Sequence, residues 1–250
     1  MMARYISDVE RPGRNTVTIR FSWDQKVEPG QFLMVWLPGH SEIPISVSHT
    51  GSVKGITIRS YGETSQAMLG LRKGDRIFFR GPYGRPFDIK PGKKLIVGGG
   101  SGMAGLLPLV DSGAYGVVSA RTSSDLLFAD RFADGHVTMV TDDGSAGIRG
   151  FAIDGVRSLR LDEFDMMYVC GPELMLKSIL DYVADKSIPA QFSLERTMKC
   201  GIGVCDSCSI DGRQLCTEGP TFSKEELMGM HEFGTTRLTE SGKRIQIGGH

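Results

Sequence analysis

The run LIVGGGSGMAG, residues 95–105, joins a short apolar segment to a dense group of glycines. An apolar strand that passes through glycines into a helix is typical of a parallel α/β sheet. The run contains the spacing G-x-G-x-x-G, in which backbone N–H groups at the start of a helix can receive a pyrophosphate. We predict dinucleotide binding here, with a flexible glycine loop as the alternative. The candidate residues are Gly98, Gly100, Ser101 and Gly102.

The same alternation continues on the C-terminal side of this run. Apolar segments at 116–119, 137–140 and 166–169 follow the one at 95–97, and helical stretches are expected at 103–110 and 173–184. Alternating strands and helices are typical of βαβ units, so we predict a nucleotide-binding α/β domain over residues 91–189.

Two further loops are expected at the carboxyl edge of this sheet, where open α/β sheets bind their ligands. TDDGS (141–145) follows one strand, and CGP (170–172) follows another and leads into a helix. A simple turn or helix cap is the alternative for the first loop, because Asp, Gly and Ser favour turns. A buried, inert thiol is the alternative for the cysteine of the second. The candidate residues are Asp142, Asp143, Cys170, Gly171 and Pro172.

One feature of an ordinary dinucleotide-binding unit is missing. About twenty residues after the glycines, where an Asp or Glu would bind the ribose, the chain has Ala120 and Arg121. We therefore do not expect an ordinary Rossmann dehydrogenase. Arg121 would suit a 2′-phosphate, and a solvated surface arginine is the alternative, so the choice between NAD and NADP stays open.

On the N-terminal side, residues 1–90 contain short alternating segments at 16–21, 32–37 and 55–59, with Pro-Gly and Gly-Asp pairs between them. Short strands with frequent turns predict a small antiparallel β-barrel.

Beyond residue 189, the run KCGIGVCDSCSIDGRQLC (199–216) holds four of the five cysteines. The spacing C-x4-C-x2-C, with a fourth Cys seven residues later, is that of plant-type [2Fe–2S] ligands. Gly201 and Gly203 can adopt positive φ and turn backbone N–H groups toward the sulfurs. Structural zinc and disulfides are the alternatives, but zinc sites usually pair two C-x2-C units and the chain has one. Over residues 190–250 we therefore predict a small cluster segment with the ligands Cys200, Cys205, Cys208 and Cys216.

Composition excludes several classes of partner. Lys and Arg together number 29, as do Asp and Glu, so the formal charge is zero and no basic field would attract nucleic acid or an anionic membrane. The most apolar stretch, 95–110, is too short to span a bilayer and is broken by glycines and a proline. The N-terminus has no signal-peptide pattern. We expect a cytoplasmic protein.

The order of barrel, glycine-rich sheet and cysteine segment resembles the ferredoxin reductase superfamily. More narrowly, it resembles the electron-transfer subunits of dihydroorotate dehydrogenase B over essentially the whole chain. The stretches that carry the resemblance are IPIS (43–46), GGGSG (98–102), TDDGS (141–145), CGP (170–172), CGIGVC (200–205) and CTEGPTF (216–222). The cysteine run is the most specific of them.

The resemblance implies FAD between barrel and sheet, NAD at the glycine-rich edge and one [2Fe–2S] cluster. It implies that Pro44, Ile45 and Ser46 touch the flavin ring, and that Arg59, Ser60, Glu63 and Thr64 handle the ribityl and phosphate end. The family usually has Arg-Pro-x-Ser where this chain has Ile43-Pro-Ile-Ser46. Because Arg suits bidentate phosphate contact, the residue that binds the phosphate is open.

The implied function is electron transfer between NAD and a partner FMN dihydroorotate dehydrogenase, through FAD and the cluster, in de novo pyrimidine (UMP) biosynthesis. No catalytic residue for dihydroorotate is expected in this chain, since no (β/α)8 barrel of about 250 residues fits beside the other parts. The resemblance implies a heterotetramer of two plus two chains. The alternatives are an NAD(P)H-dependent reductase subunit of another complex, such as a hydrogenase, sulfur reductase or transhydrogenase, and a non-catalytic zinc module.

Overall fold

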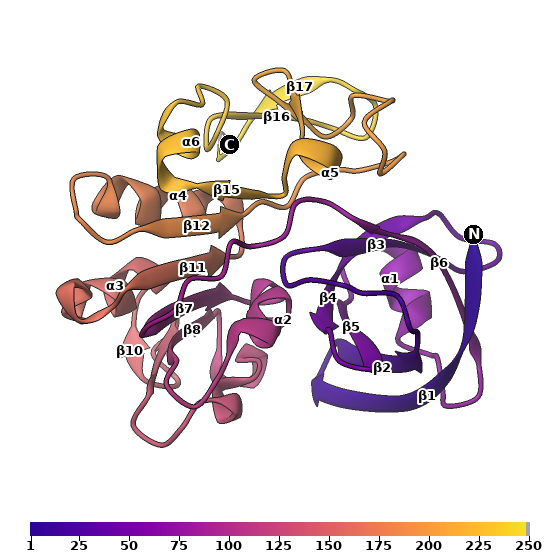
Figure 1. Ribbon diagram of the computed structural model, residues 1–250, viewed down its shortest axis with the longest axis horizontal. Coiled ribbons are helices and arrows are strands. Elements are labelled where there is room, and N and C mark those ends of the chain that lie inside the picture. Colours follow the sequence, from indigo (N-terminus) through magenta and orange to yellow (C-terminus); the bar gives the residue numbers. More distant parts are fainter. Residues whose placement is uncertain (249–250) are drawn as a thin grey trace.

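A computed structural model describes residues 1–248, which form a barrel, a sheet domain and a C-terminal segment that lies across the top of both in Figure 1. The barrel strands are β1 (Met2–Gly13), β2 (Thr16–Ser22), β3 (Phe32–Trp36), β4 (Ile43–His49), β5 (Val53–Arg59) and β6 (Arg76–Tyr83). They close antiparallel in the order β1-β2-β5-β4-β3-β6, which confirms the predicted barrel. Its interior is filled by alternate apolar side chains such as Ile19, Leu33 and Phe79. The short helix α1 (Glu63–Met68) follows β5.

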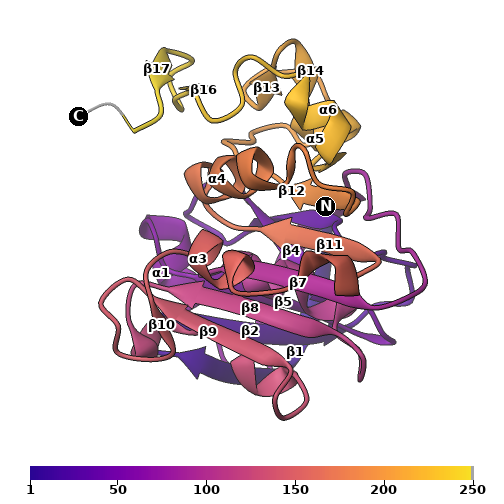
Figure 2. The ribbon, with the colours of Figure 1, turned by 90° about the vertical axis from the view of Figure 1, so that its left-hand side faces the viewer.

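The second part is a sheet with helices on both faces. Its strands are β7 (Lys94–Gly99), β8 (Tyr115–Ala120), β9 (Val137–Thr141), β10 (Ile148–Arg149), β11 (Met166–Cys170), β12 (Ala190–Ser193) and β15 (Thr221–Ser223). The order is β10-β9-β8-β7-β11-β12-β15, parallel except for β15. Helix α2 (Gly102–Leu106) lies on the face toward the barrel, and α3 (Ala152–Arg157) and α4 (Glu173–Val183) cover the other face (Figures 1 and 2). The predicted parallel sheet is confirmed.

The course of the chain through this sheet marks where a ligand would bind. From β7 the chain runs outward through β8, β9 and β10, and then returns to β11 on the opposite side of β7. The strand order therefore reverses between β7 and β11. In open α/β sheets, ligands bind at such a reversal, beyond the carboxyl ends of the strands.

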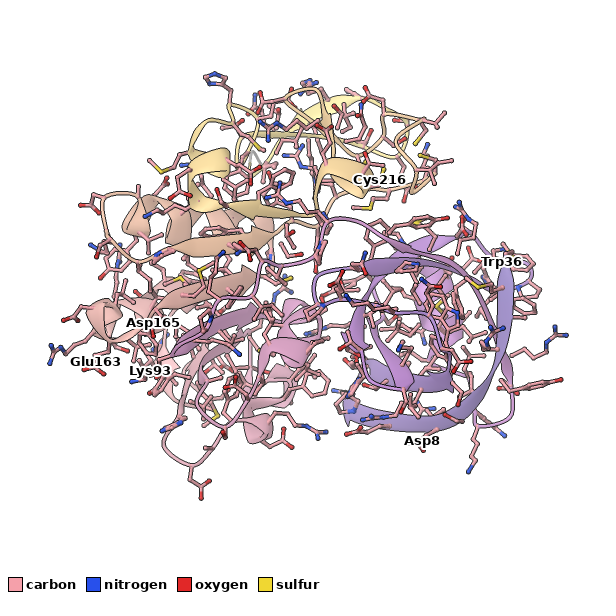
Figure 3. All side chains as sticks on the ribbon, viewed as in Figure 1. Asp8, Trp36, Lys93, Glu163, Asp165 and Cys216 are labelled. Atoms are coloured by element: carbon pink, nitrogen blue, oxygen red, sulfur yellow. The ribbon has the colours of Figure 1, made fainter. Side chains whose placement is uncertain are left out.

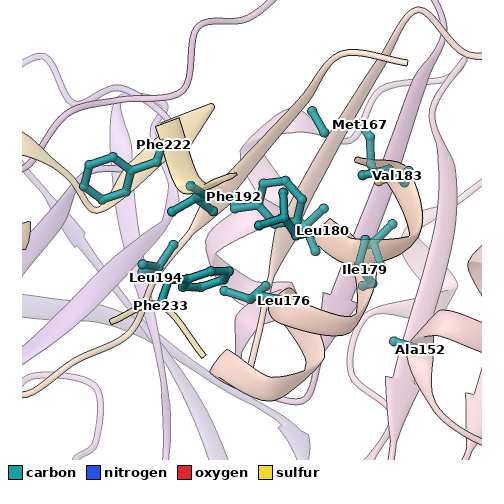
Figure 4. Packing of buried hydrophobic residues seen from close by; sticks show 14 of the residues in the cluster. Ala152, Met167, Leu176, Ile179, Leu180, Val183, Phe192, Leu194, Phe222 and Phe233 are labelled. Atoms are coloured by element: carbon teal, nitrogen blue, oxygen red, sulfur yellow. The ribbon is translucent and has the colours of Figure 1, made fainter. Parts of the chain in front are cut away.

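The C-terminal segment shares its core with the sheet. It contains β13 (Ser209–Ile210), β14 (Arg213–Gln214), α5 (Leu215–Glu218), α6 (Lys224–Met228), β16 (Thr236–Leu238) and β17 (Arg244–Gln246). Phe222 and Phe233 pack with Phe192 and Leu176 in one continuous apolar cluster (Figure 4). Strands β12 and β15 lie beyond residue 189 and extend the sheet into this segment, so the cluster segment is built onto the sheet. The last two residues of the expected 190–250 range lie outside the described residues.

Over residues 1–248, no helix has the length and apolar character that crossing a bilayer requires.

Candidate cofactor sites

The cysteine loop wraps its backbone around its own sulfurs. Cys200 Sγ accepts the N–H groups of Ile202 and Val204, both at 3.4 Å, and Cys216 Sγ accepts the N–H of Gly203 at 3.1 Å. Gly201 and Gly203 have φ values of 72° and 74°, as their place in a tight turn predicts. A Cβ atom on Gly201 would press on Met34 and Tyr83 of the barrel, so this glycine also lets the loop pack there. N–H groups directed at sulfur are what a thiolate cluster requires.

All four sulfurs lie in one neighbourhood. Burial raises the pKa of Cys200, but N–H donors from Ile202, Val204 and Cys205 outweigh it and bring the pKa to about 6. Burial, with Cys208 beside it, raises the pKa of Cys216 to about 12. Cys216 lies on the part of the C-terminal segment that faces the barrel (Figure 3). Cys205 is exposed, whereas Cys208 and Cys216 are buried.

No set of three His, Cys, Asp or Glu side chains within residues 1–248 converges tightly enough to hold a single metal ion. The cluster assignment therefore rests on three observations. They are the cysteine spacing, the N–H···S bonds, and the effect of neighbouring cysteines on the pKa values of Cys200 and Cys216. The residues present fit a thiolate-bound cluster in these three respects.

A cleft of about 810 Å³ separates the barrel from the sheet. This volume lies within the range of cofactor pockets. Pro44, Ile45, Ser46 and Arg59, all predicted to bind flavin, are among the residues that line it. Its mixture of apolar walls, hydroxyls and a guanidinium suits a flavin with its phosphates.

The other predicted flavin residues lie beside this lining. Ser60 donates its hydroxyl to Gln66 at 2.6 Å, and Thr64 is buried in α1. The Glu63 side chain is 88% exposed and lies 3.6 Å from His40. Ile43, which stands where the family usually has Arg, lines the cleft with an apolar side chain.

Two polar contacts join the barrel to the sheet at the cleft. Arg59 forms an ion pair with Asp125, at 2.7 Å, on the loop after β8. The Tyr61 hydroxyl lies 3.0 Å from Ser101 Oγ of the glycine-rich loop. These contacts place the predicted flavin arginine and the predicted dinucleotide loop at one edge.

The glycine-rich loop and the CGP loop lie side by side at the reversal between β7 and β11. A Cβ on Gly171 would meet Met175 and the backbone of Gly99, and a Cβ on Gly102 would collide with the Cys170 backbone. Gly102 is thus required for close packing of α2 against β11. Gly100 differs: its φ is 53°, and a Cβ there would meet only Arg59 Nη1, at 3.6 Å. Gly100 is therefore the glycine of this loop whose surroundings are open.

The TDDGS loop is held by hydrogen bonds between its own residues. The Asp143 carboxylate accepts the hydroxyl and the N–H of Ser145, which lower its pKa. Asp142 is exposed and donates its N–H to Ala120 of the neighbouring strand. This bonding is that of a turn, and it holds the loop at the same sheet edge as the glycine-rich loop.

The environment of Cys170 is consistent with the alternative interpretation of this residue, a buried and inert thiol. Its side chain is 2% exposed, and burial raises its pKa. It is paired with Gly98 and Ser193 in the sheet.

Several residues that line the cleft were not expected from sequence. They are Thr57, Tyr61, Glu195, Arg196, Arg237 and Glu240, among others. The strand β12 ends at Ser193, so the alternating AQFS of 190–193 is the signal that could have placed Glu195 and Arg196 at the sheet edge. Arg237 and Glu240 belong to the C-terminal hairpin, and no local pattern predicts that it reaches the cleft.

Comparison with known proteins agrees with this arrangement. The family model described as the iron-sulfur cluster binding domain of dihydroorotate dehydrogenase B matches residues 195–228. Proteins of Thermoplasma volcanium and Thermoplasma acidophilum, each named probable dihydroorotate dehydrogenase B (NAD+), electron transfer subunit, are 47% and 49% identical over 242 residues. Those alignments cover 97% of each chain. The chain belongs to this family of electron-transfer subunits.

Solved structures place the fold of this family member among the ferredoxin reductases. A chain of the NADH-dependent reduced ferredoxin-NADP oxidoreductase superposes with a TM-score of 0.78 and 25% identity, covering 90% of both chains. Phthalate dioxygenase reductase, described as transferring electrons from pyridine nucleotides to [2Fe–2S], superposes with a TM-score of 0.59 and 16% identity. It covers 98% of this chain and 76% of its own, and the likeness is one of fold.

Proposed function

We propose that this chain carries electrons between NAD(H) and a partner dihydroorotate dehydrogenase catalytic subunit, through FAD in the barrel–sheet cleft and a [2Fe–2S] cluster on the cysteine loop. The observation that carries the proposal is the order of sites. The nucleotide edge, the cleft and the cysteine loop are contiguous, because residues 194–199 line the cleft and lead directly into Cys200. When bound, the flavin exchanges a hydride with nicotinamide and single electrons with the cluster.

Named residues would hold each group. Pro44, Ile45 and Ser46 would face the ring, and Arg59, fixed by Asp125, would contact the flavin phosphates in place of the family arginine at position 43. Ser60, Glu63 and Thr64 would support that end from α1. The four loop cysteines would hold the iron.

The nucleotide would bind where the strand order reverses. Gly98, Gly100, Ser101 and Gly102 would form one side of the site, and Cys170, Gly171 and Pro172 the other. Asp142 and Asp143 would border it from the turn after β9. We propose NAD(H) as the substrate, because the relatives from the two Thermoplasma species are named as NAD+-dependent.

Reconstitution tests this function. The purified holo-protein alone should reduce an artificial dye with NADH and leave dihydroorotate untouched. Mixed with a type B dihydroorotate dehydrogenase catalytic subunit, it should confer NAD+-linked oxidation of dihydroorotate. Light scattering of the mixture should give the mass of two plus two chains. Dye reduction without any coupling to the catalytic subunit would favour the alternative of a reductase that serves another acceptor.

The catalytic subunit would dock on the cysteine loop, where electrons must leave. Ile202 and Val204 are apolar side chains that are 51% and 76% exposed there. A hollow of about 770 Å³ beside them is lined by Arg85, Arg213 and Glu218, among others. An apolar centre with a charged rim is the usual anatomy of a protein interface.

Val204→Asp tests this surface. It should raise the Kd for the catalytic subunit by about tenfold or more, because it places a charge at the centre of the contact, and should leave NADH–dye reduction unchanged. Phe151→Asp is the matched control. Phe151 is also exposed and apolar, at 65%, but lies at the start of α3, where Asp is a favourable cap. Equal effects of the two variants would refute the docking surface.

A further inference from the structure

The proposed function requires a proton to be exchanged in the cleft, and none of the residues named so far has that role. A hydride carries two electrons and one proton, whereas an iron–sulfur cluster carries electrons alone. Each passage between the two carriers therefore takes up or releases one proton at the isoalloxazine N5. A side chain that handles this proton must be titratable, must line the cleft and must be free of an ion pair.

Three of the charged side chains that line the cleft are in ion pairs. Glu42, just before β4, binds Arg80 at 2.5 Å, and Arg59 of β5 binds Asp125 at 2.7 Å. Arg196 binds Glu173 at 2.6 Å, and both side chains are buried. An arginine in such a pair keeps its proton. These groups hold the cleft together and are not available for proton exchange.

The remaining charged groups come from the cysteine segment and the C-terminal hairpin. Lys199 Nζ donates to the Glu240 carbonyl at 2.6 Å, and the Glu240 side chain is exposed on the hairpin. Arg237 does not titrate near neutral pH. The carboxyls of Glu195 and Glu240 both line the cleft, and within residues 1–248 neither has an ion pair or a side-chain hydrogen bond. Of the two, Glu195 is the one that follows a strand of the sheet directly, because β12 ends at Ser193.

Glu195 lies at the edge of the sheet, on the stretch of chain that leads to the cysteine loop. Ser193 pairs with Cys170 in the sheet, and Glu195 follows two residues later, at the same edge as the CGP loop. Five residues further on, the chain reaches Cys200. The Glu195 carboxyl is close enough to Cys170 to raise the pKa of that thiol. It thus lies between the nucleotide edge and the cysteine loop.

The surroundings of Glu195 favour its protonated form. Its side chain is open to the water of the cleft, but protein encloses the cleft around it, and this burial raises the pKa of the carboxyl above its ordinary value of 4.5. A raised pKa brings a carboxyl closer to the pH at which it can both give and regain a proton.

We propose that Glu195 is the proton-exchange residue of the flavin site. Its carboxyl gives a proton to N5 as two electrons arrive one at a time from the cluster, and a water of the cleft returns a proton to the carboxylate. The electron pair and that proton then leave together as the hydride that reduces NAD+. In the opposite direction, the Glu195 carboxylate accepts the N5 proton. The inference rests on the proposed function.

Glu195→Gln tests it, because the amide keeps the shape and cannot exchange the proton. In anaerobic stopped-flow experiments on the holo-protein, hydride transfer from NADH to the flavin should be unchanged, since the hydride brings its own proton. The following electron transfer to the cluster should slow by about 10²-fold. Glu195→Asp should recover part of the rate. Glu225→Gln, which alters an exposed carboxyl on α6 outside the residues that line the cleft, should change neither step.

Two further measurements, which do not depend on turnover, test the same inference. The pH dependence of the flavin reduction potential should show an inflection in the wild type that is absent from Glu195→Gln, and FAD content should match the wild type. Unchanged rates and an unchanged inflection in the variant would overturn the inference while leaving the proposed function intact. Loss of FAD with equal slowing of both steps would also overturn it. Failure of the wild type to take a hydride from NADH would instead overturn the proposed function.

Discussion

The buried ion pair between Glu173 and Arg196 joins the nucleotide edge to the cluster segment. Glu173 is the first residue of α4, directly after the CGP loop, and Arg196 follows β12. Their side chains are 9% and 3% exposed and form two hydrogen bonds of 2.6 and 3.1 Å. Glu173 also accepts the N–H of Gly234 at 2.9 Å. One carboxylate therefore ties α4, β12 and the C-terminal segment together.

Replacing Glu173 with Ala should lower the free energy of unfolding by about 3–5 kcal/mol, because it leaves the Arg196 charge buried. Arg196 would keep only long bonds to the carbonyls of Ser209 and Glu232, at 3.4 and 3.3 Å. For a chain of this size the loss corresponds to a fall in Tm of about 6–20 °C. The double variant Glu173→Met with Arg196→Met should recover most of it, since well-packed apolar pairs replace buried ion pairs at little cost.

Thermal unfolding of the holo-protein, followed by cluster absorbance, measures this effect, and hydrogen exchange should show faster exchange over residues 195–233. Asp162→Ala is the control, because the Arg160–Asp162 pair is exposed and should leave Tm unchanged. A Glu173→Ala variant as stable as the control, or a double variant no better than the single one, would refute the assignment of this pair as the link between the two parts.

Three further predictions concern separate sites. Gly100→Asn should slow flavin reduction by NADH at least tenfold and leave reduction by dithionite unchanged. Asn tolerates the positive φ of 53° but places a side chain in the open loop. A variant that changes the rates with NADH and with dithionite equally would contradict the nucleotide site. Cys170→Ser should leave iron content unchanged, and iron loss would contradict the ligand assignment. Glu226→Gln should lower Tm at pH 7, and this loss should shrink as the pH falls below 4.5. The Arg85 guanidinium lowers the pKa of Glu226, so its stabilising contribution is present above the ordinary value of 4.5 and is lost as pH falls through the lowered value. A loss of Tm that grows as the pH falls would oppose this.

The sequence predicted those features that depend on neighbouring residues. The alternation of apolar segments and the glycines at 98–102 indicated the parallel sheet, and the short strands before residue 90 indicated the barrel. Positive φ at Gly201 and Gly203 follows from the tight spacing of the cysteines. In each of these, the residues that determine the feature lie within one turn or strand.

Features that depend on distant segments were not predictable. The pairing of β15 with β12 requires the chain to return after the cysteine loop, and the four-residue β12 is too short for its period to be recognised. The Arg59–Asp125 and Glu173–Arg196 pairs join residues whose approach is set by domain packing. Glu195 carries no local motif, and only the cleft gives it a role.

The most direct test of the whole account is an anaerobic reductive titration of the purified protein and its Cys205→Ser variant with dithionite. A flavin takes two electrons and a [2Fe–2S] cluster takes one, so the wild type should take up about three electrons per chain and the variant about two, with the flavin bands unchanged. A wild type that takes up about two electrons, or a colourless protein that takes up none, would contradict a chain with both carriers in series.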